Sequence, residues 1–331
     1  MSAINYYSVY KPFIEDFVAL KRHLGYKYIN IEYPLMQFDQ LAYDREETAV
    51  GISKALCEHW CIRRPNESEK TWYNRILIMR QFSSFLNTLD YPSCLPKLPK
   101  IKKSTYKPYI YTKEEIAAIF AATDQLRTST TCYNSMVLIL PALFRVLYGT
   151  GLRIGEALAL SCKDIHLEEQ YIVLRDTKNG TDRMVPLSDS VTYIIAEYMN
   201  CRKWFPMVRN TDLLFVHPNG DCCYNHRVYN WFRKVLYKAG IPHKGRHQGP
   251  HMHDLRHTFS VHSLAKMAEA GSDLYYSLPV LSTYLGHSSI ASTDGYVRLT
   301  ADMYPSIITK VNNICPYLFP EIYEEASNEN S

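Results

Sequence analysis

Hydrophobic residues in the first 91 positions recur at the spacing of an α-helix. Phe13, Phe17 and Leu24 lie on one face of a first amphipathic stretch, which Gly25 would end. Three further stretches with the same spacing follow at residues 35–41, 52–60 and 69–89. We find no internal repeat. The pattern therefore predicts a small bundle of helices over residues 1–91.

A second region with a different pattern begins near residue 112. Thr112-Lys113-Glu114-Glu115 has the form of a capping box, which predicts the start of a helix. Helical spacing continues through Leu147 and returns from Arg153 to Leu160. Residues 171–187 instead predict two short strands around Asn179-Gly180, a pair that favours a tight turn. Most of the remainder is helical, so we predict a mainly α fold with a small antiparallel β-sheet.

A segment rich in proline and lysine separates the two regions. YPSCLPKLPKIKKSTYKP, residues 91–108, holds four prolines and no acidic residue. Proline lacks a backbone donor and disfavours helix, so we expect an extended linker over residues 92–111. A solvated spacer is one interpretation, and contact with DNA phosphates is the other. The lysines that would make such contacts are Lys97, Lys100, Lys102, Lys103 and Lys107.

The composition restricts the class of protein. A chain of 331 residues can form about two domains, and 47% hydrophobic with 21% charged residues is ordinary for a globular protein. No apolar run approaches the roughly 20 residues of a membrane span. The N-terminus lacks the layout of a signal peptide, so we expect a cytoplasmic protein. Nine irregularly spaced cysteines favour reduced thiols over a disulfide framework or a zinc site.

Charge is distributed unevenly along the chain. The net charge of +4 only permits a nucleic-acid partner. The linker lysines form a basic middle, whereas four glutamates follow the last basic residue, Lys310. A basic middle and an acidic tail indicate different partners for the two segments.

Four segments carry residues suited to chemistry on a phosphate. They are TGLRIGEAL at 150–158, RDTKNGTDR at 175–183, HMHDLRHTF at 251–259 and LGHSSIASTDGY at 285–296. Together they resemble the tyrosine recombinase (phage integrase) family. That family has an arginine in TGLRxxE, a hairpin lysine, HxLR, LGH and a tyrosine nine residues later, all in this order. Each motif alone is weak, but five in register are specific.

The resemblance implies a division of the chain. Residues 1–91 would form a helical core-binding domain that contacts DNA, and residues 112–304 the catalytic domain. The tail, residues 305–331, would contact a neighbouring protomer.

The chemistry explains why these residue types occur together. In-line attack on a DNA phosphodiester concentrates negative charge on the non-bridging oxygens, and fixed cationic donors lower that barrier. Arginine donates two hydrogen bonds to a phosphate from a planar fork and stays charged. The resemblance assigns this role to Arg153 and Arg256. Without the surrounding motifs, each would be interpreted as part of a surface ion pair.

The resemblance also implies roles for two histidines and a hairpin lysine. His253 would assist proton transfer or hold the phosphate, and His287 would donate a second hydrogen bond to it. Lys178 would protonate the leaving 5′ oxygen as general acid, with Arg183 as a nearby second cation on the DNA. Lysine at a hairpin tip for solubility is the alternative interpretation of Lys178.

Glu156 lies three residues after Arg153 and so shares its helix face. A carboxylate beside the scissile phosphate would repel it. We therefore expect Glu156 to orient the basic groups without contacting the DNA itself. The alternative interpretation is an ordinary glutamate on a helix surface.

Tyr296 is one of 27 tyrosines and is distinguished by its distance from His287. Nine residues of unbroken helix would separate the two by about 13 Å. Both can serve one phosphate only if the chain turns, and Gly286 with Ser288-Ser289 supplies a break. The resemblance makes Tyr296 the nucleophile that forms a 3′-phosphotyrosyl link and frees a 5′-hydroxyl. A partner strand's hydroxyl then reseals the DNA, with no metal, ATP or other cofactor.

The resemblance further implies partners. Strand exchange needs four active sites, hence a tetramer on two double-stranded recombination sites, with accessory recombinases or directionality factors as further candidates. The segment between Gly271 and Leu285 is longer than the commonest family form. This length favours integration, excision or transposition of a mobile element over chromosome-dimer resolution.

Three other hypotheses remain open. His247, His251, His253, His257 and His262 could form a metal site. No HExxH is present, however, and the arginine context favours a metal-free phosphate pocket. The second hypothesis is a catalytically silent DNA-binding regulator with the same fold, and the third is a relaxing topoisomerase with the same chemistry.

Overall fold

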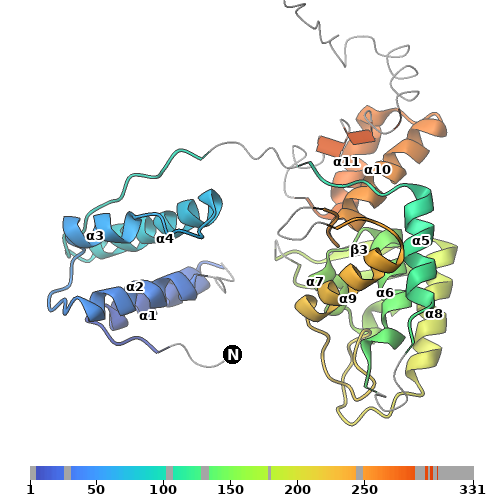
Figure 1. The fold of residues 1–331 in the computed structure, drawn as a ribbon, viewed down its shortest axis with the longest axis horizontal. Coiled ribbons are helices and arrows are strands. Elements are labelled where there is room, and N and C mark those ends of the chain that lie inside the picture. The colour runs from blue at the N-terminus through green and yellow to red at the C-terminus, as the bar shows by residue number, and fades with distance from the viewer. Residues whose placement is uncertain are drawn as a thin grey trace, which may run out of the picture. The chain divides into compact units, whose positions relative to one another are not determined.

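The computed structural model describes residues 5–25, 31–101, 107–127, 134–177, 180–243, 249–287, 295–296, 299–300 and 304. The chain divides into two units, residues 1–106 and 107–331, each with its own core (Figure 1). The fold is mainly helical with one small antiparallel sheet, as the sequence predicts. Within the described ranges, no helix is long and apolar enough to cross a membrane.

The described residues of the smaller unit form a bundle of four helices. They are α1 (Lys11–His23), α2 (Glu32–Asp44), α3 (Lys54–Cys61) and α4 (Glu69–Thr88). The longest of them, α4, contacts the other three, because its apolar stripe covers several turns. Phe17, Phe38 and Phe82 meet edge-to-face in the core. The helical bundle predicted from hydrophobic spacing is confirmed.

The linker segment leaves this unit as an extended chain. Residues 91–101 form neither helix nor strand, which agrees with the proline content. Lys97, Lys100 and Lys107 are exposed. Lys102 and Lys103 lie outside the described residues, so contact of the linker lysines with DNA stays a prediction.

The larger unit is built around a buried helix, α6 (Leu140–Thr150). Its side chains are apolar on almost every side, because it packs against neighbours on several faces. Those neighbours are α5 (Lys113–Asp124), α8 (Asp189–Arg202) and α10 (Asp254–Glu269), and α10 also packs on α11 (Leu274–Leu285) (Figure 1). The remaining α-helices are α7 (Ile154–Leu158) and α9 (Asn225–Lys238). The capping box of Thr112 and Glu115 is present at the start of α5, as predicted.

The sheet has three antiparallel strands in the order β1-β2-β3. They are β1 (Ile165–His166), β2 (Tyr171–Leu174) and β3 (Arg183–Pro186). Leu174 pairs with Arg183, so the hairpin between β2 and β3 closes where the sequence predicts it. Gly180 has a φ of 72°, and its N–H donates to Thr177 O at 2.8 Å. Lys178 and Asn179 lie outside the described residues, so the geometry of the hairpin lysine stays a prediction.

Candidate active site

Three consecutive backbone carbonyls at the end of α11 each accept a hydrogen bond from a different arginine. Tyr284, Leu285 and Gly286 accept from Arg183 (3.2 Å), Arg256 (2.7 Å) and Arg153 (3.5 Å), respectively. The last carbonyls of a helix lack partners within it and carry the negative end of its dipole, so cations are favourable there. The end of α11 therefore gathers cations from three of the four sequence motifs.

Glu156 joins two of these arginines. One carboxylate oxygen accepts from Arg153 at 2.7 Å and the other from Arg183 at 2.8 Å, and the side chain is only 8% exposed. Burial alone would raise the pKa of Glu156, but hydrogen bonds from Arg183 and Arg153 outweigh it and lower the pKa to about 2. The carboxylate is therefore ionised and holds both guanidinium groups, which is the arrangement expected of an orienting residue.

Arg183 contacts the protein with all three of its guanidinium nitrogens. Nη1 and Nη2 donate to Glu156, Nε donates to the Tyr284 carbonyl, and the side chain is 12% exposed. The sequence interpretation placed Arg183 among the DNA-contacting cations. The contacts described here are internal, and a direct DNA contact stays a prediction.

Arg256 is the most deeply buried of the three arginines, with 2% of its surface exposed. Nη1 donates to Gly151 O at 2.8 Å and Nη2 to Leu285 O at 2.7 Å. Burial and then the charge of Arg153 lower the pKa of Arg256 to about 10, so it remains a cation at neutral pH. Gly151 ends α6 with a φ of 62°, and a Cβ there would collide with Phe259. Arg256 thus fastens the end of α6 to the end of α11.

The helix break predicted after Leu285 is present. Gly286 has a φ of 66°, and the N–H groups of Gly286 and His287 donate back to Thr283 O and Ser282 O at 3.0 Å each. The His287 ring lies 6.0 Å from the Tyr296 ring, centroid to centroid, much closer than a continuous helix would allow. His287 and Tyr296 therefore do not lie on one continuous helix, and residues 288–294 are outside the described residues.

Burial, and then the charges of Arg256 and Arg153, lower the pKa of His287 to about 4. His287 is consequently neutral at pH 7. A neutral imidazole can still donate one N–H to a phosphate oxygen.

Tyr296 is 5% exposed and packs with Val261, Leu264 and Leu285. Its hydroxyl lies 3.0 Å from Nδ1 of His257. Burial raises the pKa of Tyr296, while the charge of Arg256 acts in the opposite direction without cancelling the rise. At neutral pH, Tyr296 is therefore a protonated phenol beside a cationic cluster.

His257 is the residue of this cluster that the sequence analysis missed, because it was considered only as a metal ligand. Burial, together with the nearby His253 and Arg256, lowers the pKa of His257 to about 3, so its ring is neutral. The rings of His253 and His257 lie 4.8 Å apart and perpendicular. The i, i+4 spacing of His253 and His257 could have indicated that both side chains lie on the same helix face. His253 itself is exposed at the N-cap of α10.

The other histidines of the metal hypothesis have separate surroundings. Nδ1 of His262 lies 2.9 Å from the Tyr148 hydroxyl, and the ring of His251 lies 6.2 Å from that of His243. His247 is outside the described residues. Within the described part of the chain, no group of three or more His, Cys, Asp or Glu side chains could hold a metal ion.

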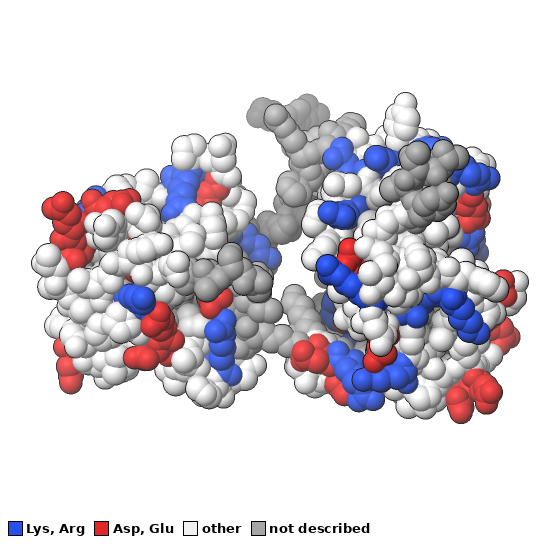
Figure 2. All heavy atoms as spheres, turned by 90° about the horizontal axis from the view of Figure 1, so that it is seen from below, with Lys and Arg blue, Asp and Glu red and all other residues white. Residues whose placement is uncertain are grey.

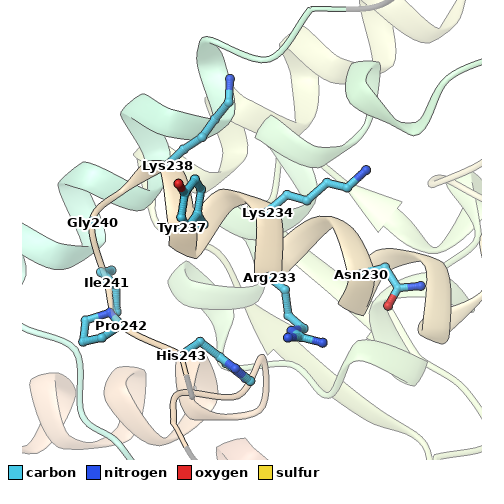
Figure 3. Close-up of a pocket in the computed structure, with 9 residues that line it drawn as sticks. All are labelled: Asn230, Arg233, Lys234, Tyr237, Lys238, Gly240, Ile241, Pro242 and His243. Carbon is cyan, nitrogen blue, oxygen red and sulfur yellow. The ribbon is translucent and has the colours of Figure 1, made fainter. Parts of the chain in front are cut away.

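A basic surface on α9 was also missed. The helix contains no Asp or Glu, and four of its basic side chains are exposed: Arg227, Arg233, Lys234 and Lys238. A hollow of about 780 Å³ lies along its C-terminal half. In Figure 3, Lys234 and Lys238 extend to one side of α9, and Arg233 and His243 to the other. Figure 2 shows basic and acidic side chains interspersed on the visible face of each unit, so a helix with only positive charges is distinct. Charge counting along residues 225–238 could have identified it.

Comparisons with known proteins agree with this geometry. Residues 110–303 match the model of the phage integrase family. The integrase/recombinase y4rB of Sinorhizobium fredii (strain NBRC 101917 / NGR234) is 26% identical over 293 residues, which cover 88% of this chain and 93% of the relative.

Two solved structures share the fold. One is the XerH site-specific recombinase bound to palindromic difH substrate in a post-cleavage complex (TM-score 0.61, 20% identity, 83% of this chain and 77% of that chain). The other is the Tn1549 transposon integrase in complex with a circular intermediate DNA (TM-score 0.60, 19% identity, 86% and 94%). Because the family model matches more than half of its length, the chain belongs to the phage integrase family of tyrosine recombinases.

Proposed function

We propose that this chain is a site-specific DNA recombinase whose Tyr296 attacks a DNA phosphate and forms a 3′-phosphotyrosyl link. The observation that carries the proposal is the burial of the Tyr296 hydroxyl beside Arg256 and His287, in the same cluster as Arg153. The family cleaves and rejoins DNA through a phosphotyrosine intermediate and needs neither metal nor ATP.

The phosphate would occupy the space in front of the arginine cluster. A guanidinium has five N–H donors, so Arg153 and Arg256 can bind non-bridging oxygens in addition to their carbonyl partners. His287 donates a further hydrogen bond as a neutral imidazole. His253 contributes from the exposed start of α10, where the helix dipole favours an anion. Lys178, at the hairpin tip, protonates the leaving 5′ oxygen.

The partner in this proposal is double-stranded DNA carrying a recombination site. Four protomers assemble on two such sites, and residues 305–331, outside the described residues, dock on a neighbour. The likeness to y4rB and to the Tn1549 integrase supports a role in moving a mobile element. The likeness to XerH keeps chromosome-dimer resolution as the alternative. A cytoplasmic location stays a prediction.

A nicked suicide substrate tests the proposal, because loss of a short fragment traps the covalent intermediate. Purified protein is incubated with nicked duplexes made from DNA that flanks its own gene. We expect an adduct that survives SDS and proteolyses to a DNA-linked peptide containing Tyr296. EDTA should leave the yield unchanged, whereas loss of the adduct in EDTA would support a metal enzyme.

Two outcomes would favour the other hypotheses. Specific DNA binding with no adduct would indicate a silent DNA-binding regulator. An adduct with relaxation of supercoils, but no recombination between sites on two plasmids, would indicate a topoisomerase.

The basic surface of α9 gives a separate prediction. We propose that Arg233 and Lys234 contact DNA phosphates, because both are exposed on a helix without acidic residues. The double variant Arg233→Ala/Lys234→Ala should bind DNA more weakly. Each lost phosphate contact should also reduce the slope of log K against log salt by about 0.9. Fluorescence anisotropy over a salt series measures both quantities.

The matched control for this prediction is Lys203→Ala/Arg209→Ala. Lys203 bonds to Asn200 and Arg209 pairs with Asp221, so these cations already have partners in the protein. The control should keep the wild-type slope. An unchanged slope in the α9 variant would show that this helix does not touch the DNA backbone.

A further inference from the structure

The Tyr296 hydroxyl lies 3.0 Å from Nδ1 of His257, which is within hydrogen-bond distance. The pKa of Tyr296 is raised, so the phenol keeps its proton at neutral pH, whereas the pKa of His257 is lowered to about 3 and its ring is neutral. A neutral imidazole has one ring nitrogen that donates and one that accepts. In the tautomer with its proton on Nε2, His257 accepts the phenolic O–H on Nδ1.

We propose that His257 is the proton acceptor for the nucleophile, taking the phenolic proton on Nδ1 as the Tyr296 oxygen attacks phosphorus. The Tyr296 oxygen–phosphorus bond forms while the bond from phosphorus to the 5′ oxygen breaks. His257 becomes an imidazolium, and the 5′ oxygen takes its proton from the general acid proposed above, Lys178. In rejoining, the incoming 5′-hydroxyl attacks phosphorus and gives up its proton to Lys178, and His257 returns its proton to the departing phenol. This inference rests on the proposed function.

Other groups at the phenol oxygen suit the role less well. Ser260 and Arg256 also act on the Tyr296 hydroxyl and lower its pKa. A serine hydroxyl is a poor base, its own O–H already donates to the Arg256 carbonyl at 2.9 Å, and a guanidinium is a cation with no acceptor. The 3.0 Å separation of His257 from the hydroxyl lies within the reach required of a general base.

The charges around His257 link its basicity to DNA binding. The groups that lower its pKa, after burial, are His253 and Arg256 on α10 and His287 at the end of α11. An anionic phosphate held by Arg256 and His287 offsets the positive charge of Arg256 and so raises the pKa of His257. His257 is accordingly a weak base in the empty site and a stronger one once the scissile phosphate is bound.

The test compares His257→Asn with His257→Ala in single-turnover cleavage of the suicide substrate. Asparagine places an amide oxygen near the position of Nδ1, so it can still accept the hydrogen bond from Tyr296 but cannot take up a proton. We expect both variants to cleave about 10²–10⁴-fold more slowly than wild type, the range for loss of a general base. DNA affinity should be unchanged. The residual rate of His257→Asn should rise with pH, because hydroxide then removes the phenolic proton, whereas the wild-type rate levels off.

The chain offers a matched control on the same helix. Nδ1 of His262 lies 2.9 Å from the Tyr148 hydroxyl, so α10 carries a second histidine–tyrosine pair away from the arginine cluster. His262→Asn should cleave at the wild-type rate. Thermal unfolding and DNA binding, measured on each variant, separate a misfolded protein from a chemically impaired one.

A 5′-bridging phosphorothiolate substrate adds a second measurement, because its sulfur leaving group departs without a proton. It should rescue Lys178→Ala and leave His257→Asn slow. Rescue of His257→Asn would overturn the inference, as would wild-type cleavage by His257→Asn, which would reduce His257 to a positioning residue. Absence of an adduct from the wild-type protein would instead refute the proposed function itself.

Discussion

Replacing Tyr296 with phenylalanine is expected to abolish the covalent DNA adduct completely. The change removes one oxygen, and the aromatic ring keeps its packing against Val261, Leu264 and Leu285. Loss of the hydrogen bond to His257 should lower the free energy of unfolding by only about 1 kcal/mol. DNA binding should persist, since the arginine cluster is intact. An SDS gel of the trapped reaction measures the adduct, and a mobility-shift assay measures binding.

Tyr193→Phe is the matched control, because Tyr193 is largely exposed on α8. It should form the adduct at the wild-type rate. An SDS-resistant adduct in the Tyr296→Phe protein would mean that another of the 27 tyrosines is the nucleophile.

The second large effect is expected for Arg256→Lys, which retains the charge and removes the planar fork. Lysine cannot bond to the Gly151 and Leu285 carbonyls and also present two donors to a phosphate. Cleavage should fall about 10²–10³-fold, as for loss of a transition-state donor. The free energy of unfolding should fall by about 1–3 kcal/mol, because a buried carbonyl loses its partner. Single-turnover cleavage and urea denaturation measure the two effects.

Arg145→Lys provides the comparison. Arg145 pairs with Asp124 in a partly exposed ion pair on the same unit, where such a change costs less than about 1 kcal/mol. Cleavage by this control should match wild type. An Arg256→Lys protein that cleaves as fast as wild type would show that Arg256 acts only as a structural tie.

Much of the fold was predictable because its signals are local. The capping box at Thr112 and the β2–β3 hairpin need only neighbouring residues to form, and the first four helices follow from periodic apolar positions. The buried pair of Arg75 and Glu67, 2.7 Å apart, was not predictable. Periodicity places charged residues on the surface, and only tertiary packing decides which of them is enclosed with a partner.

The site, too, has a part that the sequence predicts and a part that depends on tertiary packing. Motif spacing selected Arg153, Arg256, His287 and Tyr296, and the structure places them in one cluster. Motif spacing could not indicate that Tyr296 faces His257, because that contact depends on tertiary packing. Motif spacing also could not distinguish an arginine that contacts DNA from one that is held by Glu156, because the sequence motif is the same in both cases.

The three carbonyls at the end of α11 make the phosphate pocket sensitive to the position of one helix end. Arg183, Arg256 and Arg153 come from a strand and two helix starts, and each bonds to the same short turn of backbone. A shift of α11 by the rise of one residue, about 1.5 Å, would lengthen all three hydrogen bonds at once. Glu156 and the Gly151 carbonyl would still hold these arginines from their other side.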